Sequence, residues 1–201
     1  DKLGRELYEM SHKSNPDFLR VGEGCYDLQS QYYGTYTRAD YWHEPVLRYI
    51  DPTVPIACAV IDHNDLNHVN MCLADRYAMS YEVRNFKGHL GEFPRVMAYG
   101  RKVDNLRRRY ADFLWNGEFL DVLGATVKGD NIRYTVFRNL KNGKKAVVVY
   151  NVDTKKANTA SVSIDGSSAP LVLASPEKPA PAKFTGAVTL GPQSAVVIME
   201  K

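Results

Sequence analysis

The stretch VPIACAVIDHND, residues 54–65, indicates the fold more clearly than any other part of the sequence. Its first eight residues form a nearly continuous apolar run, which is typical of a parallel strand covered on both faces. The run ends abruptly in four polar residues, Asp62, His63, Asn64 and Asp65. Because parallel α/β folds build their sites at the carboxyl ends of strands, this pattern predicts a buried strand followed by a candidate site.

Helix and strand patterns alternate on both sides of this run. The 3.6-residue spacing of apolar side chains predicts helices at residues 3–14, from about 45 to 50, at 68–77 and at 94–115. Short apolar segments predict two more strands, at residues 18–21 and 78–83. Strand–helix alternation is the signature of a parallel α/β sheet.

The pattern changes near residue 122, where helical periodicity gives way to β-branched segments separated by turns. Strands are predicted at residues 132–138, 146–150, 159–164, 170–173, 184–190 and 195–199. We expect an antiparallel β-sandwich of six or seven strands. The sequence therefore predicts an α/β part, residues 1–121, followed by an all-β domain, residues 122–201.

The first part is too short to close a barrel. A complete (β/α)₈ barrel takes roughly 250 residues, or about 31 for each βα unit. Three strands can be recognised in residues 1–121, and three parallel strands leave edges with unpaired backbone groups. We expect a partial TIM-type barrel of about three βα units, completed by a missing N-terminal half or by another chain. A small open α/β domain is the alternative.

Composition and charge exclude several classes of function. The net charge of +3 is too small to predict binding to nucleic acid or to a membrane surface, and no apolar run approaches the ~20 residues of a membrane span. The basic run at residues 107–109 is interpreted as a solvated helix face or a set of ion pairs, with a polyanion contact as the alternative. The sequence leaves the compartment open.

Patterns for cofactors and metals are missing as well. Cys25, Cys58 and Cys72 have no metal-ligand spacing, so free thiols are expected. The arrangement of Asp65 between His63 and His68 matches no zinc signature, and we predict no metal. No GxSxG, Walker A or GxGxxG motif occurs, and no cofactor is predicted.

Several segments together resemble one kind of enzyme. They are RVGEG at 20–24, VIDH at 60–63, YEVRNFKG at 81–88, AYG at 98–100, LRRRY at 106–110 and LWNGEF at 114–119. The set is similar to the C-terminal half of bacterial glycoside-hydrolase-like (β/α)₈-barrel proteins, which are distantly similar to α-amylase-type and endo-α-N-acetylgalactosaminidase-type enzymes. The resemblance covers residues 1–121 and is only general beyond them.

The resemblance implies a glycosidase that works through two carboxyl groups on a carbohydrate substrate. Glu23 is the candidate general acid/base, because it follows an apolar strand between two glycines, where burial can raise the pKa of a carboxyl group. Asp62 is the candidate second catalytic carboxylate. In the families compared, however, the nucleophilic aspartate comes from an earlier strand, which would place it outside this chain.

Five further residues are candidates for binding the sugar: His63, Asp65, Arg84, Trp42 and Tyr26. A histidine and a carboxylate can hydrogen-bond hydroxyl groups, Arg84 can hold a carboxylate ionised, and aromatic rings can stack on a sugar face. Structural alternatives exist for each of them: a helix cap at Asp65, a buried ion pair at Arg84, and aromatic packing on outer helices.

Two alternatives to an enzyme remain open at this point. The chain can be a non-catalytic carbohydrate-binding or scaffold protein that keeps a barrel remnant, or a structural fragment without activity of its own. Binding of oligosaccharides without turnover would distinguish the first alternative from a glycosidase.

Overall fold

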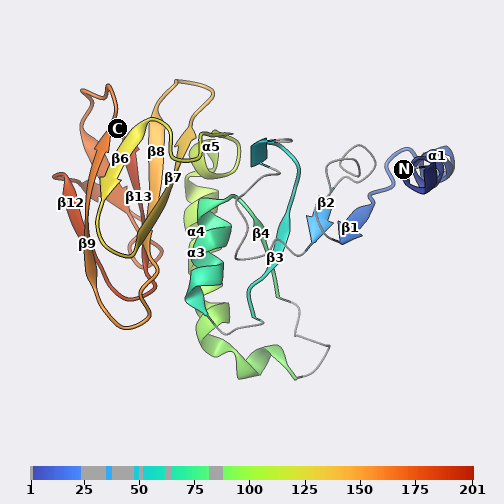
Figure 1. Cartoon of the computed structure of the whole chain (residues 1–201), viewed down its shortest axis with the longest axis horizontal. Helices are drawn as coiled ribbons and strands as arrows, with labels where there is room; N and C mark the ends of the chain where they lie inside the picture. Colours follow the sequence, from blue (N-terminus) through green and yellow to red (C-terminus); the bar gives the residue numbers. More distant parts are fainter. Residues whose placement is uncertain (1, 24–34, 38–47, 50–51, 62–64, 82–87) are drawn as a thin grey trace.

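The structure is a computed structural model that describes residues 2–23, 35–37, 48–49, 52–61, 65–81 and 88–201. A region of helices and short strands is followed by antiparallel β-sheets, so the expected succession of α/β and β-rich parts is confirmed. In Figure 1 the β-sheets lie at one end of the molecule, α3 and α4 lie beside them, and α1 lies at the opposite end.

Helix α1, Lys2–Ser14, confirms the predicted first helix. Its apolar side chains recur on one face, yet Leu3, Leu7 and Met10 are 69%, 46% and 67% exposed. The helix ends before Asn15 and Pro16, as expected from a turn-forming pair that does not continue a helix.

Two pairs of short parallel strands follow. Strand β1 (Val21–Glu23) pairs with β2 (Thr35–Thr37), and β3 (Ala57–Ala59) pairs with β4 (Ala78–Ser80). The observed β3 is therefore shorter than the strand predicted at 54–61. The strand predicted at 18–21 is shifted along the sequence, because β1 begins only at Val21. Strand β2 was not predicted from the sequence.

Helix α3, Leu66–Ala74, connects β3 to β4 and is buried along its whole length. It contacts β3 and β4 on one side and strand β8 of the large sheet on the other. Its buried polar residues Asn67 and Asn70 donate to backbone carbonyl groups of Val152 and Gln193, so burial leaves these amide groups with partners. Helix α4, Pro94–Arg109, packs beside α3.

The predicted single helix at 94–115 is wrong in one respect. Helix α4 ends at Arg109, and a separate short helix α5, Ala111–Leu114, follows. Tyr110 between them leaves the helical conformation, with φ −113° and ψ 36°, and its hydroxyl donates to the carbonyl of Pro179 at 2.8 Å. No glycine or proline marks this break in the sequence.

The β-rich part consists of two antiparallel sheets. The first has the strand order β11-β10-β13-β8-β7-β5 and the second the order β12-β9-β6. Their bounds are β5 Glu118–Phe119, β6 Ala125–Lys128, β7 Ile132–Arg138, β8 Lys145–Asn151, β9 Asn158–Ile164, β10 Leu171–Ala174, β11 Ala182–Lys183, β12 Ala187–Leu190 and β13 Ala195–Glu200. The six predicted strands are all present, whereas β5, β6 and β11 were not predicted. The first of these, β5, already pairs with β7 before residue 122.

The six-stranded sheet is buried on both faces. In β8, Ala146, Val148 and Tyr150 belong to the core shared with α3 and α4, whereas Val147 and Val149 belong to the core shared with the three-stranded sheet. This division follows the two-residue period of a strand. The helices, the large sheet and the small sheet are therefore successive layers (Figure 1).

The carboxyl end of α3 is buried, and its carbonyl groups are capped by side chains from distant parts of the chain. The Arg48 guanidinium donates to the carbonyls of Asp75 at 2.9 Å and Arg76 at 2.8 Å. Thr135 of β7 donates to the carbonyl of Ala74 at 2.6 Å. Because the last carbonyls of a helix have no partner within the helix, such donors are needed when the end is buried.

Arg107 completes this cap and corrects the interpretation of the basic run. Its guanidinium is 4% exposed and donates to the carbonyls of Cys72 at 2.5 Å and Tyr77 at 2.8 Å. The prediction of a solvated face is wrong for Arg107, which points inward because α4 packs on α3. Arg108 and Arg109 are exposed, as expected.

We predict that Arg107→Met destabilises the fold by about 2–4 kcal/mol, because methionine retains the apolar stem but leaves two buried carbonyl groups without their charged donor. Chemical denaturation followed by circular dichroism measures this change. Arg109→Met is the matched control on the same helix, and its unfolding midpoint should equal that of the wild type. Equal midpoints for both variants would contradict a capping role for Arg107.

Candidate functional site

Among the predicted site residues, the described strands place the backbone of Glu23 at a carboxyl end, and β3 and β4 end shortly before residues 62–64 and 82–87 in the sequence. The parallel register of β3 and β4 extends to a hydrogen bond from the Val60 amide to the Ser80 carbonyl, 3.0 Å long. The chain therefore leaves both strands at the same edge, toward residues 62–64 and 82–87. Glu23 ends β1, where its Cα pairs with Thr37 of β2, and β2 in turn contacts β3.

Five of the seven predicted site residues lie outside the described residues. They are Tyr26, Trp42, Asp62, His63 and Arg84. Glu23 is described through its backbone, as the last residue of β1. The catalytic and sugar-binding roles given to these residues remain predictions.

Asp65 is fully described, and its carboxylate caps a helix. It is the N-cap residue of α3, and its Oδ1 accepts a hydrogen bond from the Asn67 amide at 2.9 Å. The same oxygen accepts a hydrogen bond from the side-chain amide of Gln193. The helix-cap alternative is therefore observed for Asp65, while its predicted contact with a sugar remains a prediction.

Gln193 connects this capping residue to the loop before β13. It is 5% exposed and has a positive φ of 50°. Its Oε1 accepts from Arg95 Nη2 at 3.0 Å, and its backbone carbonyl accepts from Asn70 Nδ2 at 3.0 Å. The Tyr99 hydroxyl donates to Asn70 Oδ1 at 2.7 Å.

This network fixes the position of Asp65, at which α3 begins directly after residues 62–64 in the sequence. Burial raises the pKa of the Tyr99 hydroxyl, which keeps it protonated as a donor. Sequence reasoning missed Gln193, since it lies 128 residues from Asp65 and no local pattern marks it.

Two of the three cysteines are buried free thiols, as expected, and Cys25 lies outside the described residues. Burial raises the pKa of the Cys72 thiol well above its ordinary value, and a hydrogen bond with Cys58 raises it further. A thiol that is protonated at neutral pH is a poor nucleophile, so Cys72 does not support nucleophilic catalysis.

Within the described ranges, no three histidine, cysteine or carboxylate side chains come together as metal ligands. In the same ranges no helix is both long enough and apolar enough to cross a membrane.

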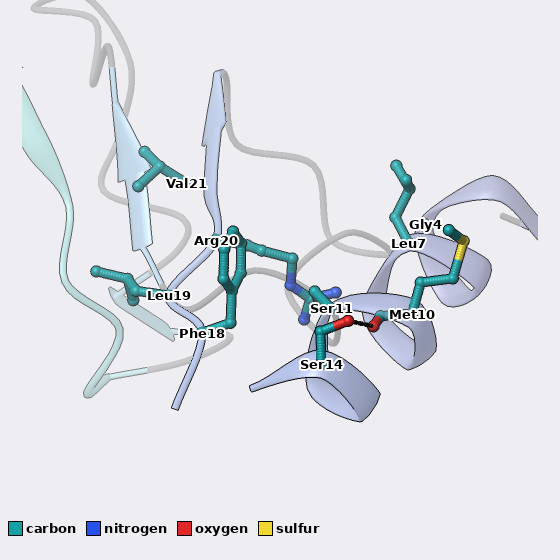
Figure 2. Close-up of a pocket in the computed structure, with 9 residues that line it drawn as sticks. All are labelled: Gly4, Leu7, Met10, Ser11, Ser14, Phe18, Leu19, Arg20 and Val21. Atoms are coloured by element: carbon teal, nitrogen blue, oxygen red, sulfur yellow. Dashed lines mark hydrogen bonds between the residues drawn. The ribbon is translucent and has the colours of Figure 1, made fainter. Parts of the chain in front are cut away.

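A groove of about 590 Å³ lies between α1 and residues 18–21 (Figure 2). Its walls are mainly apolar side chains, with two serines and Arg20 as the polar members: Gly4, Leu7, Met10, Ser11, Ser14, Phe18, Leu19, Arg20 and Val21. The Arg20 guanidinium lies 4.2 Å from the centroid of the Tyr8 ring. Among the described lining residues there is no carboxylate of the kind that glycoside hydrolysis requires.

Sequence comparisons identify no relative. No protein-family model matches the chain, and no curated protein sequence matches it significantly.

Comparison with solved structures gives a clear fold. The chain is similar to AmyB from Thermotoga neapolitana, described as a noncanonic maltogenic α-amylase, with a TM-score of 0.62 and 8% identity over 97% of this chain and 58% of that chain. It is also similar to Amy13B from Eubacterium rectale, with a TM-score of 0.50 and 12% identity over 97% of this chain and 55% of that chain. The chain spans little more than half of either structure. It therefore has a glycoside-hydrolase-like fold.

Proposed function

We propose that this chain is the C-terminal portion of a glycoside hydrolase that cleaves an oligo- or polysaccharide by two-carboxylate acid/base chemistry. One observation supports the proposal above the others: Glu23 is the last residue of β1, and β3 ends at Ala59 shortly before Asp62, within a glycoside-hydrolase-like fold. The maltogenic α-amylase among the similar structures makes an α-linked glucan the first substrate to examine.

In this proposal Glu23 protonates the leaving glycosidic oxygen. The second carboxylate comes from Asp62 or from a preceding part of the barrel. A separation of about 5–5.5 Å between the two carboxyl groups gives retention of configuration, whereas about 6.5–9.5 Å leaves room for a water molecule and gives inversion. Asp65, His63 and Arg84 bind the sugar hydroxyl groups.

The aromatic candidates Trp42 and Tyr26 stack on the sugar in the same proposal. No metal or cofactor takes part in it. The β-rich part supports the site through the contact of Gln193 with Asp65.

We further propose that residues 1–121 are the last βα units of a (β/α)₈ barrel and that residues 122–201 form a β-sandwich domain. The parallel pairs β1–β2 and β3–β4 support the first part, and the shared core of the two antiparallel sheets supports the second. Further βα units would cover the exposed apolar face of α1 and pair with the strand edge at β1.

A non-catalytic carbohydrate-binding role is the second candidate, because the chain spans 58% of AmyB and has four short parallel strands among its described residues. Isothermal titration of the chain with maltoheptaose, combined with an assay for released reducing ends, separates the candidates. Binding without turnover favours this second role for the chain by itself.

We predict that Glu23→Gln lowers glycosidase activity by about 10²–10⁴-fold, because glutamine cannot donate the proton that the leaving group requires. The assay uses a protein in which this chain is joined to the remaining barrel units. Glu177→Gln is the matched control, because Glu177 is an exposed carboxylate that pairs with Lys102 on the surface. Activity of Glu23→Gln within a few-fold of wild type would remove Glu23 from the mechanism.

We also predict that the chain by itself associates through the groove beside α1. Multi-angle light scattering should show a mass above the 22.6 kDa of one chain, and Leu7→Asp/Met10→Asp should return the mass toward that value, since charged residues do not cover an apolar face. Arg5→Ala/Glu9→Ala is the control, because both side chains are 68% exposed. A wild-type chain that remains monomeric at all concentrations would argue against an incomplete barrel.

A further inference from the structure

A second hollow lies at the other end of β3, where the chain enters the strand. It has a volume of about 430 Å³, within the usual range of ligand pockets. Residues 52–55 before β3 form one wall. The rest of the lining includes charged groups of both signs and consists of Arg48, Arg76, Trp115, Asn116, Gly117, Glu118 and Leu140. The candidate catalytic residues follow the carboxyl ends of the strands, so this pocket lies at the opposite edge of the β3–β4 pair.

Trp115 lines this pocket, and its ring is in contact with a buried cation. The Arg107 guanidinium lies 5.0 Å from the centroid of its ring and is itself held by two buried carbonyl groups. The buried cation supports the ring from inside the molecule, while 44% of Trp115 remains exposed. An aromatic side chain that is already held in place loses little conformational freedom when it binds a ligand.

Polar groups stand around the ring. Asn116 is exposed beside it, and Arg76 is held at the rim by a hydrogen bond from Nη1 to the Gly117 carbonyl at 2.7 Å. Leu140, which is 69% exposed, adds an apolar edge. An apolar face combined with a few convergent polar groups suits a sugar ring, which has C–H groups on its face and hydroxyl groups at its rim.

We propose that this pocket is a saccharide-binding site that holds a neutral oligosaccharide against Trp115. The choice of a saccharide rests on the proposed function, since the same polymer would be bound here and cleaved at the carboxyl ends of the strands.

The two tryptophans of the chain allow a direct test. In a ¹⁵N-labelled chain each indole N–H gives one NMR signal, and Trp115→Phe and Trp42→Phe assign the two signals. Titration with maltoheptaose should shift the Trp115 signal in a saturable manner. Sorbitol, which has hydroxyl groups but no ring, should leave that signal unchanged.

The outcomes separate this proposal from the proposed function. A shift of the Trp42 signal alone would overturn the pocket but support sugar binding near the predicted catalytic residues. A shift of the Trp115 signal alone would support the pocket without supporting that catalytic site. If neither signal moves, or if sorbitol shifts the Trp115 signal equally, the pocket does not bind saccharides.

A pair of variants measures the contribution of the ring. Trp115→Ala should weaken maltoheptaose binding by about tenfold, as expected when one well-placed aromatic contact is lost. Leu140→Asp alters the pocket without removing the contact of Arg107 with Trp115, and it should also weaken binding while the unfolding midpoint is retained. Unchanged affinity in both folded variants would overturn the assignment.

Discussion

The buried carboxyl end of α3 is the constraint on which the arrangement of the layers depends. A helix can be buried at its end only when its last carbonyl groups find donors. Here the donors come from Arg48, Arg107 and Thr135, which lie on three different elements. Positive charge at a helix carboxyl end is also favoured by the helix dipole. Because Arg107 lies in α4 and Thr135 lies in the large sheet, the hydrogen bonds that they donate hold both elements against α3.

The large sheet also connects the α/β part to the β-rich part, because it is buried on both faces. Val147, Val148 and Val149 are all fully buried, although an antiparallel sheet commonly has one face in water. Val148 packs toward the helices and its two neighbours pack toward the small sheet. The α/β part and the β-rich part thus share one continuous core, and the sequence change near residue 122 does not mark a separation in packing.

The sequence predicted those elements whose structure depends mainly on neighbouring residues. Strand β7 was predicted with the observed bounds, since its alternation and the Lys141–Lys144 turn depend on neighbouring residues. The break at Tyr110 and the burial of Arg107 were missed because both depend on packing against distant segments. Strands β5 and β11 have two residues each, which is too short for a period to be visible.

In the candidate site, too, only the features that depend on local sequence could be predicted. A carboxylate after an apolar strand can be recognised from sequence, and the backbone of Glu23 does end β1. The helix cap at Asp65 was recognised only as an alternative, because Asp, Asn, Ser and Thr all cap helices frequently. The contact between Gln193 and Asp65 could not be recognised, since the two residues lie 128 positions apart in the sequence.

That contact also suggests why a β-rich part would accompany a barrel-like part. Catalytic groups need to be held within a fraction of an ångström, and loops are held less firmly than strands or helices. Residues 62–64 lie between β3 and α3 in the sequence, and the described chain resumes at Asp65, whose carboxylate is fixed by α3 and by Gln193. Gln193 is fixed in turn by Asn70 and Arg95, from α3 and α4. The loop before β13 therefore restrains Asp65, which directly follows the segment that contains Asp62 and His63 in the sequence.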